Sequence, residues 1–426
     1  MKENILFVNR EIIKGLPIAT PRAHFLTYEL LSKHMNVTVL STRNEVDGSG
    51  KGFVFEVLYE GSEPMQLRHR FTESKTRLAI ATILSSSGLH RLSIRAKWKD
   101  PRTMAMPDFF LDFDVIVFEQ GPTTNFITRD IAEHLQAPVV DRFYNISPIQ
   151  FLGNLRAWAS YFSEHLWMYR IPNFFNEALS RNFSLYSIVN KCSCRNITTV
   201  SESDKLLIAS KLNNRQIETI ETIYPPQMLR EDWRDDLYNY PTLNNHGIQV
   251  SNDKRRYIMF YGSPRVSYSL TLRYISSLAK KFKNIDFVIC GLPAVPYSAF
   301  CTGSNVRFLG YVESEREFLQ LVRNSELVIF PLLESQGFQT KIIPALFCSK
   351  PIIATSVAVN SFRQLINSNE ILVEDDPQEF EKVVERLLGD ANLRDKLGAS
   401  SLSLYRRFFS SAAFTTHFNS FLQKVK

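Results

Sequence analysis

YIMFYGSPR, residues 257–265, is a short apolar run that ends at Gly262 and passes into a polar turn. Four similar runs follow, each separated from the next by enough chain for a helix or a long connection. Apolar runs of this kind are typical of parallel strands that are buried on both faces. Residues 256–400 are therefore expected to form one doubly wound α/β domain. The four runs are DFVICG (286–291), VRFLGY (306–311), LVIFPL (327–332) and PIIAT (351–355).

The N-terminal half shows the same alternation, with a predicted helix at residues 22–34. It predicts a second Rossmann-like domain over residues 1–226, so the fold class is α/β with two doubly wound domains facing a cleft. Residues 227–255 are predicted to be a polar linker or insertion. Residues 401–426 are predicted to form a helix that packs back on the N-terminal domain. The predicted strands are NILFVNR (4–10), VTVLST (37–42), VIVFEQG (115–121), APVVDRF (137–143), NITTV (196–200) and IETIYPP (220–226).

Composition excludes several classes of protein. The 426 residues are 44% hydrophobic and 22% charged, which is ordinary for a globular protein and unlike a disordered or fibrous one. The net charge of +7 and the lack of any nucleic-acid motif do not point to nucleic-acid binding. Five cysteines without a spaced framework indicate a reducing compartment, and no apolar run is long enough to span a bilayer. We expect a cytoplasmic protein, with peripheral attachment to the cytoplasmic face of a membrane as a further expectation.

From about Tyr257 onward the sequence resembles the nucleotide-sugar domain of group 1 retaining glycosyltransferases, which have the GT-B fold. Four blocks in the family's order carry the resemblance, over the C-terminal third of the chain. The resemblance implies transfer of a sugar from a nucleotide-diphosphate donor with retention of configuration and without a metal or other cofactor. The blocks are YIMFYGSPR (257–265), NVRFLGYVESEREFLQLVRNSELVIFPL (305–332), ESQGFQTKIIPALFCSKPIIAT (334–355) and ILVEDDPQEFEKVVERLLGDANLRDKLG (371–398).

The loop after Pro331 suits a diphosphate on physical grounds. A helix is predicted to start near Thr340, and the free N–H groups of a helix N-terminus attract anions. Lys341 in its first turn adds a cation, and Arg265 adds a second one after the first strand. Stabilising the charge that develops on a leaving diphosphate would be the main catalytic task. The predicted donor-binding residues are Gly262, Arg265, Gln336, Gly337, Phe338, Gln339, Thr340 and Lys341.

This chain departs from the family at several positions. The family carries two glutamates eight residues apart, and here Gln336 and Pro344 occupy those positions. Glu334 is the predicted catalytic substitute for the first glutamate, whereas Pro344 cannot bind a ribose hydroxyl. Ser263 and Tyr268 fall where the family's arginine and lysine are expected. A catalytically degenerate GT-B subunit that binds a partner transferase or a glycan is therefore the alternative, and a sugar-nucleotide epimerase is the second.

In the N-terminal domain, Glu119 and Asp141 follow apolar strands and are the predicted catalytic carboxylates. Either could accept the proton of an acceptor hydroxyl, or instead cap a helix or pair with Arg142. Arg10 and Gly15 are predicted on the acceptor side. Asp114, in the sequence Asp-Phe-Asp, is expected to be a strand-entry residue, and no metal site is predicted.

Two regions of the N-terminal half suggest an acceptor at a lipid surface. Residues 65–102 hold nine Lys or Arg against two acidic residues, and residues 143–186 hold twelve aromatic residues. They fit either an inner-leaflet contact or, equally, packing on the sheet with a solvated charged face. The predicted partners are a nucleotide sugar, a glycan or polyprenyl-linked acceptor and a membrane surface, in cell-surface polysaccharide synthesis.

Overall fold

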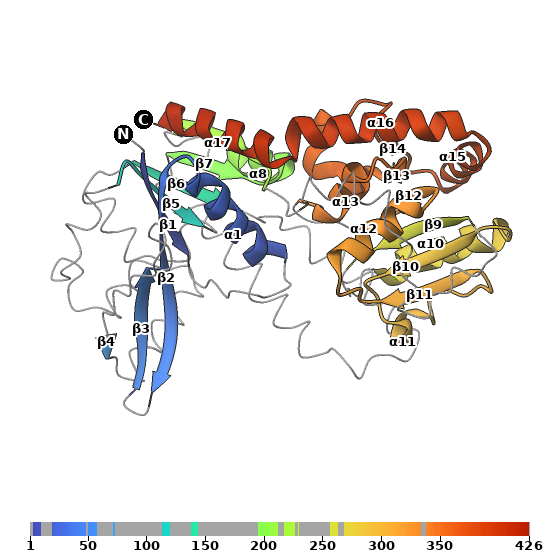
Figure 1. Cartoon of the computed structure of the whole chain (residues 1–426), viewed down its shortest axis with the longest axis horizontal. Helices are drawn as coiled ribbons and strands as arrows, with labels where there is room; N and C mark the ends of the chain where they lie inside the picture. Colours follow the sequence, from blue (N-terminus) through green and yellow to red (C-terminus); the bar gives the residue numbers. More distant parts are fainter. Residues whose placement is uncertain are drawn as a thin grey trace. The chain divides into compact units, whose positions relative to one another are not determined.

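The structure, a computed structural model, describes residues 3–9, 19–47, 50–57, 71–72, 113–119, 138–143, 195–211, 217–225, 229, 256–262, 268–333 and 338–425 (Figure 1). The chain divides into two compact units, and the boundary falls between Pro226 and Gln227. After the second unit the chain returns to the first one at Ser411. Most of the predicted linker at 227–255 lies outside the described residues.

The second unit contains a six-stranded parallel sheet with the order β11-β10-β9-β12-β13-β14. The five predicted apolar runs form its first five strands, and β14 is an addition at one edge. Its order is that of a doubly wound sheet, in which the chain reverses direction beside the first strand. The strands are β9 (Tyr257–Tyr261), β10 (Asp286–Cys290), β11 (Val306–Gly310), β12 (Leu327–Phe330), β13 (Ile352–Ala354) and β14 (Leu372–Val373).

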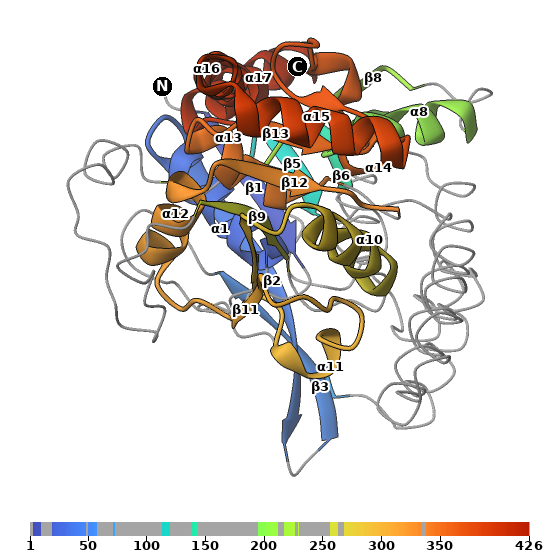
Figure 2. The same ribbon diagram turned by 90° about the vertical axis from the view of Figure 1, so that its right-hand side faces the viewer.

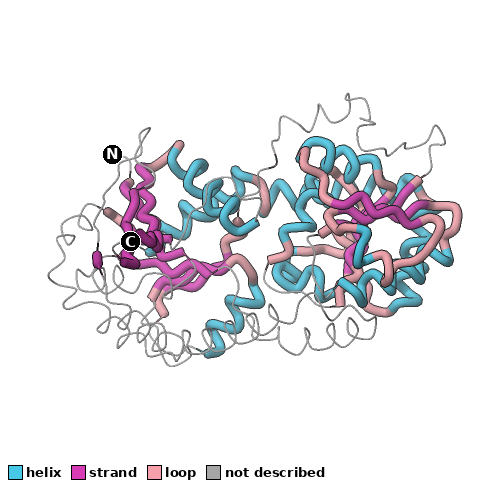
Figure 3. Tube along the Cα trace, turned by 90° about the horizontal axis from the view of Figure 1, so that it is seen from below, coloured by secondary structure: helices cyan, strands magenta, loops and turns pink. Residues whose placement is uncertain are grey.

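The helices of the second unit cover both faces of this sheet, as Figure 3 shows. Helices α10 and α12 lie on opposite sides of the strands (Figure 2). All residues of β9, β10, β12 and β13 are buried in consequence, which explains their uninterrupted apolar sequences. The helical elements are α10 (Tyr268–Lys281), α11 (Ala294–Tyr297), α12 (Glu315–Asn324), η4 (Thr340–Ile342), α13 (Ile343–Phe347), α14 (Ser356–Val359), η5 (Asn360–Leu365), α15 (Pro377–Gly389) and α16 (Ala391–Phe408).

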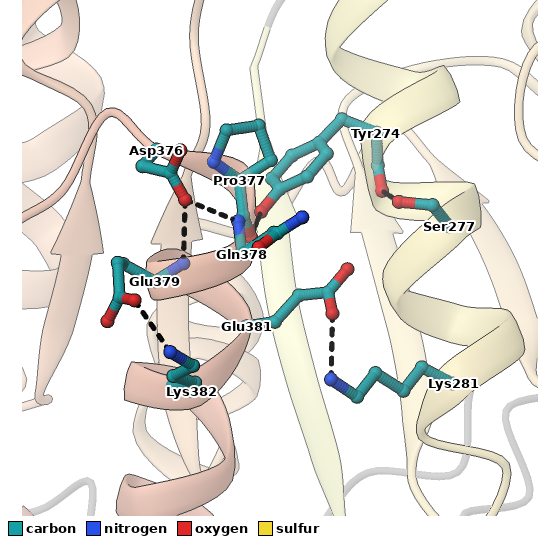
Figure 4. A network of polar contacts seen from close by, with 9 residues as sticks. All are labelled: Tyr274, Ser277, Lys281, Asp376, Pro377, Gln378, Glu379, Glu381 and Lys382. Atoms are coloured by element: carbon teal, nitrogen blue, oxygen red, sulfur yellow. Dashed lines mark hydrogen bonds and ion pairs between the residues drawn. The ribbon is translucent and has the colours of Figure 1, made fainter.

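Polar contacts join α10 to α15 on the surface of this unit (Figure 4). Tyr274 donates a hydrogen bond of 3.0 Å to the carbonyl oxygen of Pro377, and Lys281 pairs with Glu381 at 2.7 Å. Asp376 caps α15 by accepting from the backbone N–H groups of its first turn. The start of α15 is thus attached to the middle of α10.

The first unit is built on an eight-stranded sheet with the order β4-β3-β2-β1-β5-β6-β7-β8. Strands β1, β2, β5, β6, β7 and β8 are parallel, as predicted, while β3 and β4 add an antiparallel edge. Strand β2 pairs through Asp47 with Gly50 of β3, and so short a connection permits only an antiparallel hairpin. The strands are β1 (Asn4–Asn9), β2 (Asn36–Asp47), β3 (Gly50–Val57), β4 (Phe71–Thr72), β5 (Val115–Glu119), β6 (Val139–Phe143), β7 (Asn196–Thr199) and β8 (Thr219–Thr222).

Three described helices belong to the first unit: α1 (Ala19–Ser32), α8 (Glu202–Lys211) and α17 (Ser411–Val425). The C-terminal helix was predicted over residues 401–426, but residues up to Phe408 continue α16 of the second unit. They do so because Tyr405 is buried there, with its ring 5.4 Å from that of Phe347. The change of unit falls at Ser411 instead.

Helix α17 completes the core of the first unit. Its Phe418 ring lies 6.2 Å from Phe7 of β1, and Phe7 in turn contacts Tyr28 of α1 at 4.8 Å. Lys424 also pairs with Glu221 of β8. Residues from the two ends of the described chain therefore pack in one hydrophobic cluster.

Candidate functional site

Two glycines bring the carboxyl ends of three neighbouring strands together in the second unit. The N–H of Gly262 donates to Cys290 at 3.1 Å, and the N–H of Gly291 donates to Gly310 at 2.6 Å. Gly291 has a φ of +82°, and a Cβ there would lie 2.4 Å from the carbonyl oxygen of Gly262. Only glycine fits at residue 291, so the backbones of β9 and β10 approach closely where a ligand is expected in this class of sheet.

Tyr268, the first residue of α10, covers the end of β9. Its side chain is buried, and its ring packs edge-on against Phe260 at 5.5 Å. A Cβ on Gly262 would lie 2.7 Å from the Tyr268 hydroxyl and 2.9 Å from a ring carbon. The absence of a side chain at residue 262 is therefore what makes room for this tyrosine.

Lys341 of η4 contacts Tyr268 of α10. Its Nζ donates a hydrogen bond to the Tyr268 hydroxyl and lies 4.5 Å from the centroid of the tyrosine ring. The two residues are 73 positions apart in the sequence. The structure thus brings together Gly262 and Lys341, two predicted donor-site residues, and joins them through a residue that was not among the predicted ones.

The helix start expected near Thr340 is present, but it differs from the expected anion site. Residues 340–342 form a single 3₁₀ turn, and α13 has only five residues. The backbone N–H groups of Thr340 and Ile342 already donate to Phe338 and Gln339, both at 3.1 Å. So short a helix has little dipole to attract an anion, and the positive charge at this position comes from Lys341. Pro344 sits in the first turn of α13, where it removes no helical hydrogen bond.

Phe338, two residues before η4, packs in an aromatic cluster. It is stacked on Phe409 at 5.6 Å and lies edge-on to Phe362 at 5.9 Å. Gln339 beside it is buried as well. These contacts fix the position of the two residues that precede η4 at Thr340.

Glu119, at the end of β5, is paired with Arg142 of β6. The distance from Oε1 to Nη1 is 3.5 Å, and both side chains are fully buried. Arg142 also donates to Thr27 of α1 and lies 5.7 Å from the rings of both Phe414 and Phe418. Pairing with Arg142, one of the interpretations offered for Glu119, is what the structure shows.

Asp141 lies on the other face of the same sheet. Glu119 is in register with Arg142, whereas Asp141 is in register with Phe118. Because successive side chains of a strand point to opposite faces, Asp141 and Glu119 are separated by the sheet. Asp141 is fully buried on its side. The two predicted catalytic carboxylates therefore cannot act on one acceptor hydroxyl.

Asp114 accepts a hydrogen bond of 2.8 Å from the backbone N–H of Asn4, as a strand-entry residue does. Among the described residues no group of three or more His, Cys, Asp or Glu could hold a metal ion. No helix in that part of the chain combines the length and hydropathy needed to cross a membrane. Several predicted features lie outside the described residues: Arg10, Gly15, Arg265, Glu334, Gln336, Gly337, and nearly all of residues 65–102 and 143–186.

Two Rossmann-like units in one chain define the GT-B fold, and solved structures of that fold match the chain over its full length. HepE from Anabaena in complex with UDP is 12% identical, with a TM-score of 0.58, over 99% of each chain. Sucrose-phosphate synthase from Thermosynechococcus elongatus is 11% identical, with a TM-score of 0.58, over 100% of this chain and 99% of that chain. Trehalose 6-phosphate synthase from Burkholderia multivorans is 10% identical, with a TM-score of 0.62, over 100% and 97%.

The family comparison adds to this result in the second unit. Residues 255–390 match the family model "Glycosyl transferases group 1". The resemblance of this part of the chain to group 1 glycosyltransferases is therefore confirmed. No curated protein matches the sequence.

Tyr268 is the residue of the site that sequence reasoning missed. It stands where the family has a lysine, so the sequence alone indicates the loss of a cation. The contact with Lys341 joins the first helix of the domain to a turn after its fourth strand. Local sequence carries no signal for such a contact, although the unusual tyrosine itself marks the position.

Proposed function

We propose that this chain is a glycosyltransferase that moves a sugar from a nucleotide-diphosphate sugar to a glycan or lipid-linked acceptor. The observation that carries the proposal is the Lys341 ammonium group, held on Tyr268 beside the carboxyl end of β9 in a group 1 domain. A cation at this end of a doubly wound sheet suits the diphosphate of a nucleotide.

Lys341 would act on the leaving group. As the bond between sugar and diphosphate breaks, negative charge grows on the diphosphate oxygens, and a fixed ammonium group stabilises it. Gly262 has no side chain, so the backbone at the end of β9 is not covered by one from this residue. Arg265 is proposed as a second cation, so that the reaction needs no metal ion, and retention of configuration follows the family resemblance.

Asp141 is the better of the two candidates for the acceptor side. Glu119 is neutralised by Arg142, so its carboxylate is engaged in an ion pair. Asp141 points to the opposite face of the sheet from that pair. We propose that Asp141 binds or deprotonates the acceptor, and that the setting is cell-surface polysaccharide synthesis at the cytoplasmic face of a membrane.

A degenerate, non-catalytic subunit is the second candidate, and Pro344 favours it. This residue stands where the family has the glutamate expected to bind ribose, and its ring sits in the first turn of α13. A proline side chain cannot accept a hydrogen bond from a hydroxyl group. No observation on the described residues favours an epimerase.

The proposal is tested by titrating the full chain with UDP, GDP, dTDP and CMP and measuring heat of binding. We expect one nucleotide to bind wild type and to bind Lys341→Ala at least about ten-fold more weakly, because a charge-assisted contact is lost. Lys382→Ala is the matched control, since Lys382 is exposed on α15, where it pairs with Glu379. UDP is the first probe because HepE was solved with UDP.

The outcomes separate the two candidates. Binding of a nucleotide together with turnover of its sugar supports the transferase. Binding without turnover, when glycan and polyprenyl-linked acceptors are both supplied, supports the degenerate subunit. If none of the four nucleotides binds wild type, the donor site proposed here does not exist.

A further inference from the structure

We infer that Tyr268 is a positioning residue, which orients the ammonium group of Lys341 for the donor diphosphate. In this chain the cation of the donor site comes from η4, and an aromatic hydroxyl at the start of α10 holds it in place. The inference rests on the proposed function, and it gives a task to the residue that stands where the family has a lysine.

Tyr268 is itself held rigidly. It opens a helix of fourteen residues, and only 3% of its surface is exposed. Its ring is confined between Phe260, at 5.5 Å, and the Cα of Gly262, where a Cβ would clash with it. A side chain fixed by the core on several sides can serve as a reference point for a mobile one.

Lys341 has the more flexible side chain of the two. A lysine side chain has four rotatable bonds and loses considerable entropy when it is fixed. Tyr268 contacts it in two ways, through the hydroxyl and through the ring face at 4.5 Å, which is within the range of a cation–π interaction. An ammonium group that is already in position loses less conformational entropy when the diphosphate binds.

The charge of this contact suits an anionic ligand. The Lys341 ammonium group donates to the oxygen of a tyrosine, which is a neutral partner. Tyr268 therefore holds a positive charge in place without cancelling it, as the recognition of a diphosphate requires.

The experiment is a double-mutant cycle on nucleotide binding by the full chain. UDP and GDP are titrated into wild type, Tyr268→Phe, Lys341→Ala and the double variant. We expect Tyr268→Phe to weaken nucleotide diphosphate binding by roughly three- to ten-fold, because it loses the hydrogen bond to a charged group but keeps the ring. In the Lys341→Ala background the same change is expected to have no effect, since nothing remains to be positioned.

Two further variants complete the test. Gly262→Ala adds the Cβ that would displace the Tyr268 ring, so it should weaken binding while leaving both polar groups intact. Tyr274→Phe is the matched control on the same helix, because its hydroxyl donates to Pro377 on α15 and not to Lys341. It should leave nucleotide affinity unchanged. Circular dichroism establishes that each variant is folded.

The inference fails, and the proposed function survives, if wild type binds a nucleotide but Tyr268→Phe binds it equally well. It fails in the same way if the losses caused by Tyr268→Phe and Lys341→Ala simply add. Absence of nucleotide binding by wild type overturns the proposed function and the inference together.

Discussion

Glu119 and Arg142 form an ion pair inside the first unit, 3.5 Å apart and with no exposed surface on either side chain. The pair is enclosed by apolar side chains, since the guanidinium carbon lies 5.7 Å from the rings of both Phe414 and Phe418. Arg142 thereby links the sheet to α17, and through Thr27 to α1. We therefore assign the Glu119–Arg142 pair a structural role in the first unit.

Removing one partner of this pair should destabilise the protein strongly. We expect Arg142→Ala or Glu119→Ala to lower the free energy of unfolding by about 3–5 kcal/mol, because each leaves a buried charge without its partner. Urea denaturation followed by circular dichroism measures the change. The double variant Glu119→Leu with Arg142→Met should lose less than either alanine variant, and equal losses would contradict the proposed role of the pair.

A change at Asp141 should affect turnover, in contrast to the changes at Glu119 and Arg142, which should affect stability. We expect Asp141→Asn to reduce sugar transfer by about 100-fold or more, as the loss of a general base does, while nucleotide binding stays the same. A steady-state assay with the nucleotide sugar identified by titration measures the change. If Glu119→Gln lowers turnover at a stability like that of wild type and Asp141→Asn does not, the assignment of the two carboxylates is reversed.

Asn305 should be a strong determinant of stability in the second unit. Its amide nitrogen donates to Ala279 at 3.0 Å, Phe282 at 3.1 Å and Ile285 at 2.8 Å, around the end of α10. Asn305→Ala removes a buried amide group that ties these three residues together, so we expect a loss of about 1–3 kcal/mol. Thermal unfolding measures it, with the exposed Asn324→Ala at the end of α12 as a comparison.

Cys290 and Cys301 should be unreactive in the folded protein. Burial raises the pKa of each thiol from 9.0 to about 12, so both remain protonated at neutral pH. Iodoacetamide at pH 8 is expected to modify them only after unfolding, because the thiolate is the nucleophile. Peptide mass spectrometry distinguishes these residues from the other cysteines, and rapid labelling under native conditions would refute the expectation.

The same pKa shifts affect stability at alkaline pH. The unfolded chain releases these protons above about pH 9, whereas the folded chain keeps them until about pH 12. Their contribution is therefore fully present below pH 9 and declines as the pH rises from 9 toward 12. Urea midpoints measured at several pH values should fall in that range, and Cys290→Ala should reduce the slope.

Most of the fold could be predicted from the sequence, because parallel strands that are buried on both faces have uninterrupted apolar sequences. The runs at 257–262 and 286–291 are apolar at nearly every position, and both became fully buried strands. The antiparallel edge formed by β3 was not predicted. Its turn sequence Asp47-Gly48-Ser49-Gly50 was the available signal, and it indicates a hairpin only when the strand before it is known to extend that far.

The candidate site was harder to predict, for two physical reasons. The opposite orientations of Glu119 and Asp141 depend on the register between β5 and β6, which one sequence does not specify. The contact between Tyr268 and Lys341 depends on the packing of Tyr268 against Gly262, which follows β9. Long-range packing of this kind follows from the three-dimensional arrangement and not from local pattern.

Helix α17 gives the first unit a particular order of assembly. Its buried residues Phe414, Phe418, Phe421 and Leu422 share a core with Ile5 and Phe7 of β1. During synthesis on the ribosome, β1 emerges before the second unit and this helix emerges after it, so the first unit completes its core only after the second unit has been made. A chain that stopped before Ser411 would leave aromatic surface of β1 uncovered, and expression trials with shortened or C-terminally fused versions should take that into account.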